Sequence, residues 1–130
     1  MTTTQTTLNA VGLAPILTVN NVEKSMRFYE GLGFGIEERF EQDGKVMGAM
    51  LRAGDARLNL TQDDWGKGRD RVKGVGFRIF IVTGQDIDDV AAKAKTAGVP
   101  IESGPKDQPW GRSFTANDPD GFKVTIARER

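Results

Sequence analysis

The chain has 130 residues, of which 38% are hydrophobic and 28% charged, and its 18 Lys and Arg residues balance its 18 Asp and Glu residues. This length and composition suit a single globular domain with a buried core. The balanced charge provides no basic field for nucleic acid or an anionic membrane surface, and no apolar run is long enough to span a bilayer. We therefore expect no nucleic-acid or membrane partner, and a cytoplasmic location.

Cysteine and histidine are both absent. Their absence excludes disulfides, thiolate zinc sites and thiol nucleophiles, and it removes the most common neutral metal ligand and general base. A metal ion would have to be a hard cation bound by oxygen atoms alone. This removes most metal-assisted enzyme chemistry. The glycines form neither a Walker loop nor a dinucleotide fingerprint, and we expect no cofactor.

The first half of the chain predicts a strand, a helix and three further strands. Residues 1–10 begin with a Thr-rich run that lacks the segments of a signal peptide, and we expect a disordered tail there. Asn20, with Glu23 three residues later, predicts an N-cap and capping box. Apolar residues then recur at helical spacing until Gly33, which suits a helix C-cap. The strands are predicted at residues 13–19, 34–41, 45–53 and 56–61.

The second half repeats this order. Residues 62–74 are polar and predict an exposed loop between the halves. Asp86 predicts the N-cap of a second helix, which ends at Gly98. Because the same order of elements occurs twice, we predict an internal duplication within one domain, residues 11–130, with modules at about 11–61 and 75–128. The strands of the second module are predicted at residues 75–82, 99–103, 112–117 and 122–128.

Four short motifs resemble those of a known superfamily: SMRFY at 25–29, LGF at 32–34, PWGR at 109–112 and DPDG at 118–121. Together they resemble the vicinal oxygen chelate (VOC) superfamily, which includes glyoxalases, bleomycin-resistance proteins and extradiol dioxygenases. The similarity extends over about residues 13–128. It implies an α+β fold of two βαβββ modules, whose curled mixed sheets surround a cup-shaped cavity. It also implies a homodimer, and leaves open whether the modules pack within one chain or exchange between chains.

The resemblance also identifies where metalloenzymes of this superfamily place their His and Glu ligands. The corresponding positions are Ala14, Asn59, either Phe77 or Arg78, and Thr125. None of these side chains is a strong ligand for Fe(II), Zn(II) or Ni(II). The chain therefore resembles most closely the metal-free, bleomycin-resistance-like members.

Several residues are candidates for contact with a ligand in the cup. Trp110 lies in a Pro-Trp-Gly loop, where it either stacks on a ligand or plugs the end of the sheet. Trp65 either closes over the cup or packs at a dimer contact. Arg78 either faces solvent or binds an anion, and Arg112 presents the same choice. The full set expected to contact a ligand is Phe40, Met50, Asn59, Trp65, Arg78, Trp110, Arg112, Phe114 and Thr125.

Asp118 and Asp120 could form a catalytic carboxylate pair, but Asp-Pro-Asp-Gly is also a common composition of a type I turn, which we favour. We assign no catalytic residue. We favour a protein that sequesters a hydrophobic or aromatic compound, for example an antibiotic, without a metal. The alternative is a VOC-fold lyase, isomerase or dioxygenase that is metal-free or uses oxygen ligands, with Glu38, Glu41 or Glu102 as base. A third interpretation is a structural dimer whose own side chains fill the cup.

Overall fold

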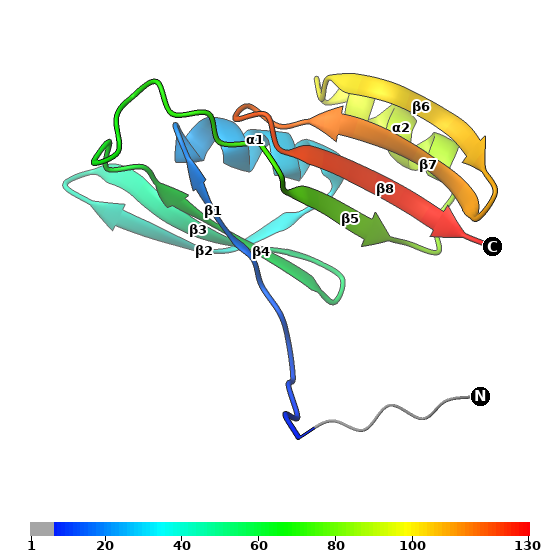
Figure 1. Cartoon of the computed structure of the whole chain (residues 1–130), viewed down its shortest axis with the longest axis horizontal. Coiled ribbons are helices and arrows are strands. Elements are labelled where there is room, and N and C mark those ends of the chain that lie inside the picture. Colours follow the sequence, from blue (N-terminus) through cyan, green and yellow to red (C-terminus); the bar gives the residue numbers. More distant parts are fainter. Residues whose placement is uncertain (1–6) are drawn as a thin grey trace.

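The computed structural model of the chain describes residues 7–130. It confirms an α+β fold in which the order strand, helix, three strands occurs twice (Figure 1). Of the predicted tail, residues 1–6 lie outside the described residues. The first module comprises β1 (Ile16–Val19), α1 (Val22–Leu32), β2 (Gly35–Gln42), β3 (Lys45–Ala53) and β4 (Ala56–Gln62). The second comprises β5 (Arg78–Val82), α2 (Ile87–Thr96), β6 (Ile101–Gln108), β7 (Gly111–Asn117) and β8 (Lys123–Glu129).

Each module forms one four-stranded mixed sheet. The strand orders are β1-β4-β3-β2 and β5-β8-β7-β6, so the two sheets have the same topology. In each sheet the first and last strands of the module pair in parallel, and the other neighbours pair antiparallel. The helices contact one another, and the two sheets lie side by side along the long axis of the molecule (Figure 1). One face of each sheet packs against the helical layer, and we call the other the open face.

The N-cap of α1 is one residue later than predicted. Asn21, and not Asn20, accepts a hydrogen bond on its side chain from the backbone N–H of Lys24, at 3.1 Å. The Asn20 side chain instead accepts a hydrogen bond from Lys73 Nζ at 2.6 Å. The predicted C-cap is confirmed, because Gly33 has a φ of 114°, a left-handed conformation that suits glycine.

The Asp-Pro-Asp-Gly turn, which lies between β7 and β8 of the second module, contacts the first module. The turn itself is confirmed, since the backbone N–H of Gly121 donates to the Asp118 carbonyl at 3.0 Å. The buried Asp118 carboxylate also accepts a hydrogen bond from the Tyr29 hydroxyl of α1 at 2.8 Å. Burial, reinforced by the charge of Asp118, raises the pKa of Tyr29 far above its ordinary value. Asp120 accepts a hydrogen bond from the backbone N–H of Asn20 at 2.9 Å. These two carboxylates therefore stabilise the junction between modules.

Within residues 7–130, neither helix has the length and apolar composition needed to cross a membrane. The loop between modules is longer than predicted, because β5 begins at Arg78 and not at residue 75. We call residues 63–77 the linker.

Candidate functional site

The open face of the first sheet is identified by the burial of alternate residues. Leu51 on β3 and Leu58 on β4 are buried against the helical layer, at 0% and 2% exposure. Since successive side chains of a strand point to opposite faces, Met50 and Asn59 lie on the open face. The register places Met50 beside Asn59, and Asn59 beside Ile16 of β1. These three residues form a row across the first sheet.

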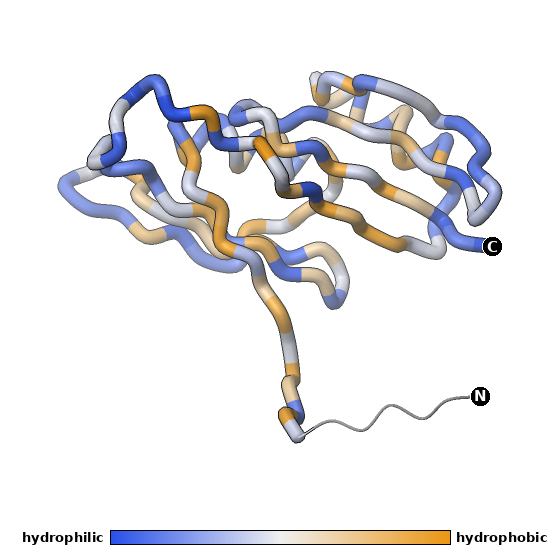
Figure 2. Tube along the Cα trace, in the orientation of Figure 1, coloured by the Kyte–Doolittle hydropathy of each residue, from blue (hydrophilic) through white to orange (hydrophobic). Residues whose placement is uncertain are grey.

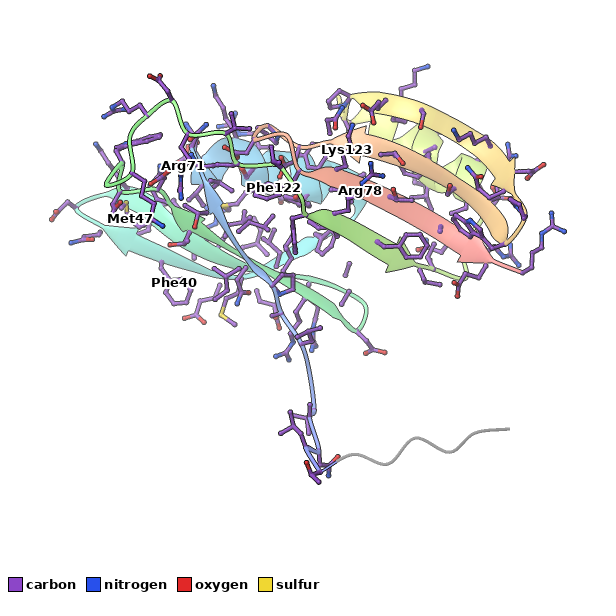
Figure 3. The ribbon with its side chains drawn as sticks, in the orientation of Figure 1. Phe40, Met47, Arg71, Arg78, Phe122 and Lys123 are labelled. Atoms are coloured by element: carbon purple, nitrogen blue, oxygen red, sulfur yellow. The ribbon has the colours of Figure 1, made fainter. Side chains whose placement is uncertain are left out.

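Phe40 extends the same face towards the outer strand. It is opposite Gly48 in the β2–β3 register, and a β-carbon built on Gly48 would contact the Phe40 ring at 3.4 Å. Figure 3 shows the Phe40 side chain pointing away from β2 on the side opposite the helices. Its exposure of 47% leaves the ring free to contact another molecule. Three of the predicted ligand contacts, Phe40, Met50 and Asn59, therefore lie on one open face.

The structure shows which residues of β5 face the core and which lie on the open face. Ile79 and Ile81 pack against the core, so Arg78, Phe80 and Val82 lie on the open face of the second sheet. Of the two alternatives left by the sequence, Arg78 and not Phe77 belongs to this face.

An aromatic pair and a hollow mark the centre of this second open face. The rings of Phe80 and Trp110 meet edge to face, with centroids 5.5 Å apart, and both remain partly exposed, at 52% and 40%. Beside Phe80 in the register lies Thr125, whose hydroxyl is 2.9 Å from that of Thr115. These residues line a hollow of about 480 Å³. The predicted contacts Trp110, Arg78 and Thr125 come together here.

Charged side chains line one end of the hollow. Arg78 of β5 lies beside Lys123 of β8 in the register (Figure 3). Lys123 donates to a carboxylate oxygen of Glu102 and to the Asn117 side chain. The hydrogen bond from Lys123 lowers the pKa of Glu102. Glu102 is thus an ionised partner of a lysine, an environment that does not favour the predicted alternative role as a base.

Two predicted contacts lie on the opposite face of the second sheet. Arg112 makes two hydrogen bonds to Asp88 of α2, at 2.9 and 3.1 Å, and another to Asp107 at 3.0 Å. These carboxylates raise the pKa of Arg112 and occupy its guanidinium. Phe114 pairs with Ile126 and is 1% exposed, so it belongs to the core. Both residues are therefore left out of the candidate site.

Trp65 packs within the linker. Its ring is covered by the Arg69 guanidinium, 4.5 Å from the ring centroid, and by Lys73 Nζ at 5.3 Å. Its backbone N–H donates to Asp63 at 2.9 Å. The structure thus gives Trp65 partners inside its own loop, apart from the hollow beside Trp110.

The donor atoms on the open faces do not suit a transition metal. Ala14 lies before β1, so the neighbour of Asn59 on β1 is Ile16 and not the expected Ala14. The neighbour of Thr125 on β5 is Phe80, and neither Phe77 nor Arg78. An amide oxygen, a hydroxyl already paired with Thr115, and two apolar side chains are poor ligands for Fe(II), Zn(II) or Ni(II). Among residues 7–130, no group of three or more Asp and Glu side chains is arranged to hold a metal ion.

The single chain does not show an enclosed cup. All residues that line the 480 Å³ hollow belong to the second module. A larger hollow, of about 860 Å³, lies where the ends of α1 and β3 approach the loop between β5 and α2. That hollow contains none of the exposed aromatic rings, so we regard the second open face as the better candidate site.

Sequence reasoning missed several residues of this face. Phe80 lies in the run Val-Gly-Phe-Arg-Ile-Phe-Ile-Val, where apolar residues occupy both faces and alternation cannot identify the core side. The polar residues on β7 did carry a signal. Ser113 and Thr115 alternate with Phe114 and Ala116, which indicates that Phe114 belongs to the buried face. The other missed residues that line the hollow are Ile79, Ser103, Lys106, Gln108 and Lys123.

Comparisons with known proteins agree with this architecture. The family model of the Glyoxalase/Bleomycin resistance protein/Dioxygenase superfamily matches residues 7–126. A search of curated proteins found no match. Among solved structures, the chain is similar to TnmS3, an antibiotic binding protein from Streptomyces sp. CB03234, with 25% identity and a TM-score of 0.71 over 97% of this chain and 100% of that one.

Two further solved structures have the same fold. A glyoxalase/bleomycin resistance protein from Streptomyces sp. CB03234 is 26% identical, with a TM-score of 0.65 over 89% of this chain and 98% of that one. TioX from Micromonospora sp. ML1 is 17% identical, with a TM-score of 0.74 over 93% of this chain and 100% of that one. The likeness to TioX concerns the fold alone.

Proposed function

The chain belongs to the glyoxalase/bleomycin resistance protein/dioxygenase superfamily, and from this membership we propose that it is a binding protein that sequesters a small aromatic compound without a metal. The observation that carries the proposal is the exposed Phe80–Trp110 pair over a hollow of about 480 Å³. Two aromatic rings that meet edge to face in a concave site offer both a stacking surface and an apolar wall. The nearby hydroxyl groups of Thr115 and Thr125 supply hydrogen bonds that orient the bound compound.

Binding is favoured over catalysis by the chemistry of the open faces. The positions that would have to hold a metal carry Asn59 and Thr125, with Ile16 and Phe80 beside them. The carboxylate that lines the hollow, Glu102, is engaged with Lys123. The similarity to TnmS3 makes an antibiotic one reasonable class of ligand. Stoichiometric capture would then protect the cell by lowering the free concentration of the compound.

We further propose that the working form is a homodimer. Each sheet has one face without a covering layer, and large apolar side chains are exposed there, such as Ile16 at 66%, Phe80 at 52% and Val82 at 53%. Exposed apolar groups gathered on one surface favour association. If the open face of the first sheet in one copy covers the second sheet of the other, two equivalent cups form about a two-fold axis. Phe40, Met50 and Asn59 would then form the wall opposite Phe80 and Trp110.

Tryptophan fluorescence tests the binding function. In a Trp65→Phe variant the remaining emission comes from Trp110, so a screen of planar aromatic natural products reports directly on the hollow. We expect at least one class of compound to change this emission saturably. Trp110→Ala should weaken its binding about tenfold, since a lost aromatic contact is worth roughly 1.4 kcal/mol.

Trp65→Phe serves as the matched control, because Trp65 lies in the linker and should not affect affinity measured by calorimetry. If no compound changes the emission and Trp110→Ala only lowers the stability of the protein, Trp110 is a structural plug and the binding proposal fails.

A further inference from the structure

The hollow on the second open face carries a local excess of positive charge. Arg78, Lys106 and Lys123 line it, against the single carboxylate of Glu102. The chain as a whole has no net charge, so this excess is a property of the site. A concave surface with one sign of charge raises the local concentration of ligands of the opposite sign.

Arg78 is the cation best placed to bind an anion. Lys123 already contacts Glu102, whereas Arg78 forms no ion pair or side-chain hydrogen bond with any residue in the described range 7–130. Its side chain is exposed on the open face, beside Lys123. A guanidinium presents parallel N–H donors that match the two oxygens of a carboxylate. The site therefore has an anion receptor whose donors are free.

The aromatic pair lies within reach of this receptor. Arg78 and Phe80 are alternate residues of β5, so their α-carbons are roughly 7 Å apart on the same face. Thr125 lies beside Phe80, and Thr115 next to it across the sheet. Because the two hydroxyls share one hydrogen bond, the proton of the accepting hydroxyl is free to donate to a ligand. Ring, hydroxyl and guanidinium thus follow one another along one surface.

We propose that this site selects aromatic compounds that carry an anionic group such as a carboxylate, with the ring on Phe80 and Trp110 and the anion on Arg78. The inference rests on the proposed binding function and names its ligand class. It separates this chain from binding proteins for cationic compounds, because Arg78, Lys106 and Lys123 would repel a cationic substituent at the same position.

Three probes that share the naphthalene ring and differ in charge test the preference: 2-naphthoate, its neutral amide 2-naphthamide, and the cation 2-naphthylmethylammonium. Calorimetry on the intact protein should give affinities that decrease from the carboxylate to the amide to the cation. The carboxylate should bind about tenfold more tightly than the amide. Added sodium chloride should weaken binding of the carboxylate and leave the amide unchanged.

Arg78→Gln should remove the preference for 2-naphthoate and leave 2-naphthamide binding as it was. The matched control is Arg128→Gln, which removes the same charge from the same sheet; Arg128 pairs with Arg112 and so lies on the opposite face. Circular dichroism checks that both variants fold. Arg78→Lys should retain part of the preference, since lysine keeps the positive charge but lacks the parallel N–H donors of the guanidinium.

The outcomes separate the two proposals. Equal binding of carboxylate and amide, or loss of 2-naphthoate binding in Arg128→Gln as large as that in Arg78→Gln, overturns the anion assignment and leaves the binding function standing. If none of the three probes binds at its solubility limit, the anion assignment fails, and the fluorescence screen alone decides the binding function.

Discussion

Asp63 holds the linker between the modules in place. Asp63 is 5% exposed, and its carboxylate accepts hydrogen bonds from Lys73 Nζ and Arg71 Nη2, each at 2.9 Å, and from the backbone N–H of Trp65. Lys73 is itself 4% exposed on its side chain. The hydrogen bond from Lys73, followed by that from the Trp65 backbone, holds the pKa of Asp63 well below its usual range. Residues 71–73 lie in the linker five residues before β5 begins at Arg78, so this cluster helps to position the second module.

We expect Asp63→Asn to lower the urea midpoint of unfolding at neutral pH, because Lys73 loses the charge that compensates its burial. The effect should depend on pH in a defined direction. The unfolded carboxyl takes up its proton near its ordinary pKa of about 4, while the folded carboxyl stays ionised at lower pH. The contribution of Asp63 is therefore present above about pH 4 and is lost as the pH falls towards the lowered pKa.

Urea unfolding at a series of pH values measures how the contribution of Asp63 to stability depends on pH. The difference between wild type and Asp63→Asn should shrink as the pH falls below about 4. Asp64→Asn is the control, because Asp64 is exposed and its carboxylate accepts from the Gly66 backbone N–H alone among residues 7–130. A difference that grows on acidification would contradict the assignment.

At the scale of single elements, neighbouring residues of the same type limit what the sequence can specify. Asn20 and Asn21 are equally good N-caps, and helix boundaries from sequence are uncertain by one or two residues. Only the structure shows that Asn21 has the extended backbone of a cap, with φ −149° and ψ 107°, while Asn20 turns to Lys73.

Alanine substitution distinguishes the two asparagines. Asn21→Ala should lower the free energy of unfolding by about 1 kcal/mol, the usual effect of removing an N-cap. Asn20→Ala should lower the free energy of unfolding by a smaller amount, because it removes one exposed hydrogen bond to Lys73. Chemical denaturation of the two variants in parallel is the measurement. If Asn20→Ala destabilised the protein more than Asn21→Ala, Asn20 would be the N-cap after all.

Strand faces were predictable where apolar and polar residues alternate, and not elsewhere. Asn59 and Thr125 stand between buried apolar neighbours, so their place on open faces follows from the sequence. The run around Phe80 has apolar residues on both faces of the strand. Which of them face the core depends on the pairing with β8. The pairing of Arg112 with Asp88 could not be predicted either, because Asp88 is 24 residues away in sequence.

At the scale of the whole molecule, the duplicated order of elements and the family resemblance were enough to predict the fold. They did not specify how the two modules meet, because the contacts involved are far apart in sequence and involve individual side chains. Tyr29 reaches Asp118, 89 residues later, and Asn20 reaches Asp120, 100 residues later. Figure 2 shows that apolar residues also continue along the exposed segment before β1. That segment includes Leu8, Val11 and Leu13, which are 78% or more exposed.

This arrangement leads to a prediction about assembly. We expect a dimer at micromolar concentration, because large apolar side chains such as Ile16, Phe80 and Val82 are exposed on the open faces. Ile16 lies on the open face of the first sheet and is 66% exposed. Ile16→Asp should therefore shift the dimer towards monomer without loss of secondary structure, since the new charge would have to be desolvated at the interface.

Light scattering coupled to size exclusion, over a dilution series, gives the mass of each variant. Ala92→Asp is the control, because Ala92 is exposed on α2, away from the open faces. A wild-type monomer throughout the series would contradict the dimer, and the aromatic site of the second sheet would then have to work as an open surface. If Ile16→Asp dissociates the dimer and also weakens ligand binding, while Ala92→Asp does neither, the two sheets form the walls of one shared cup.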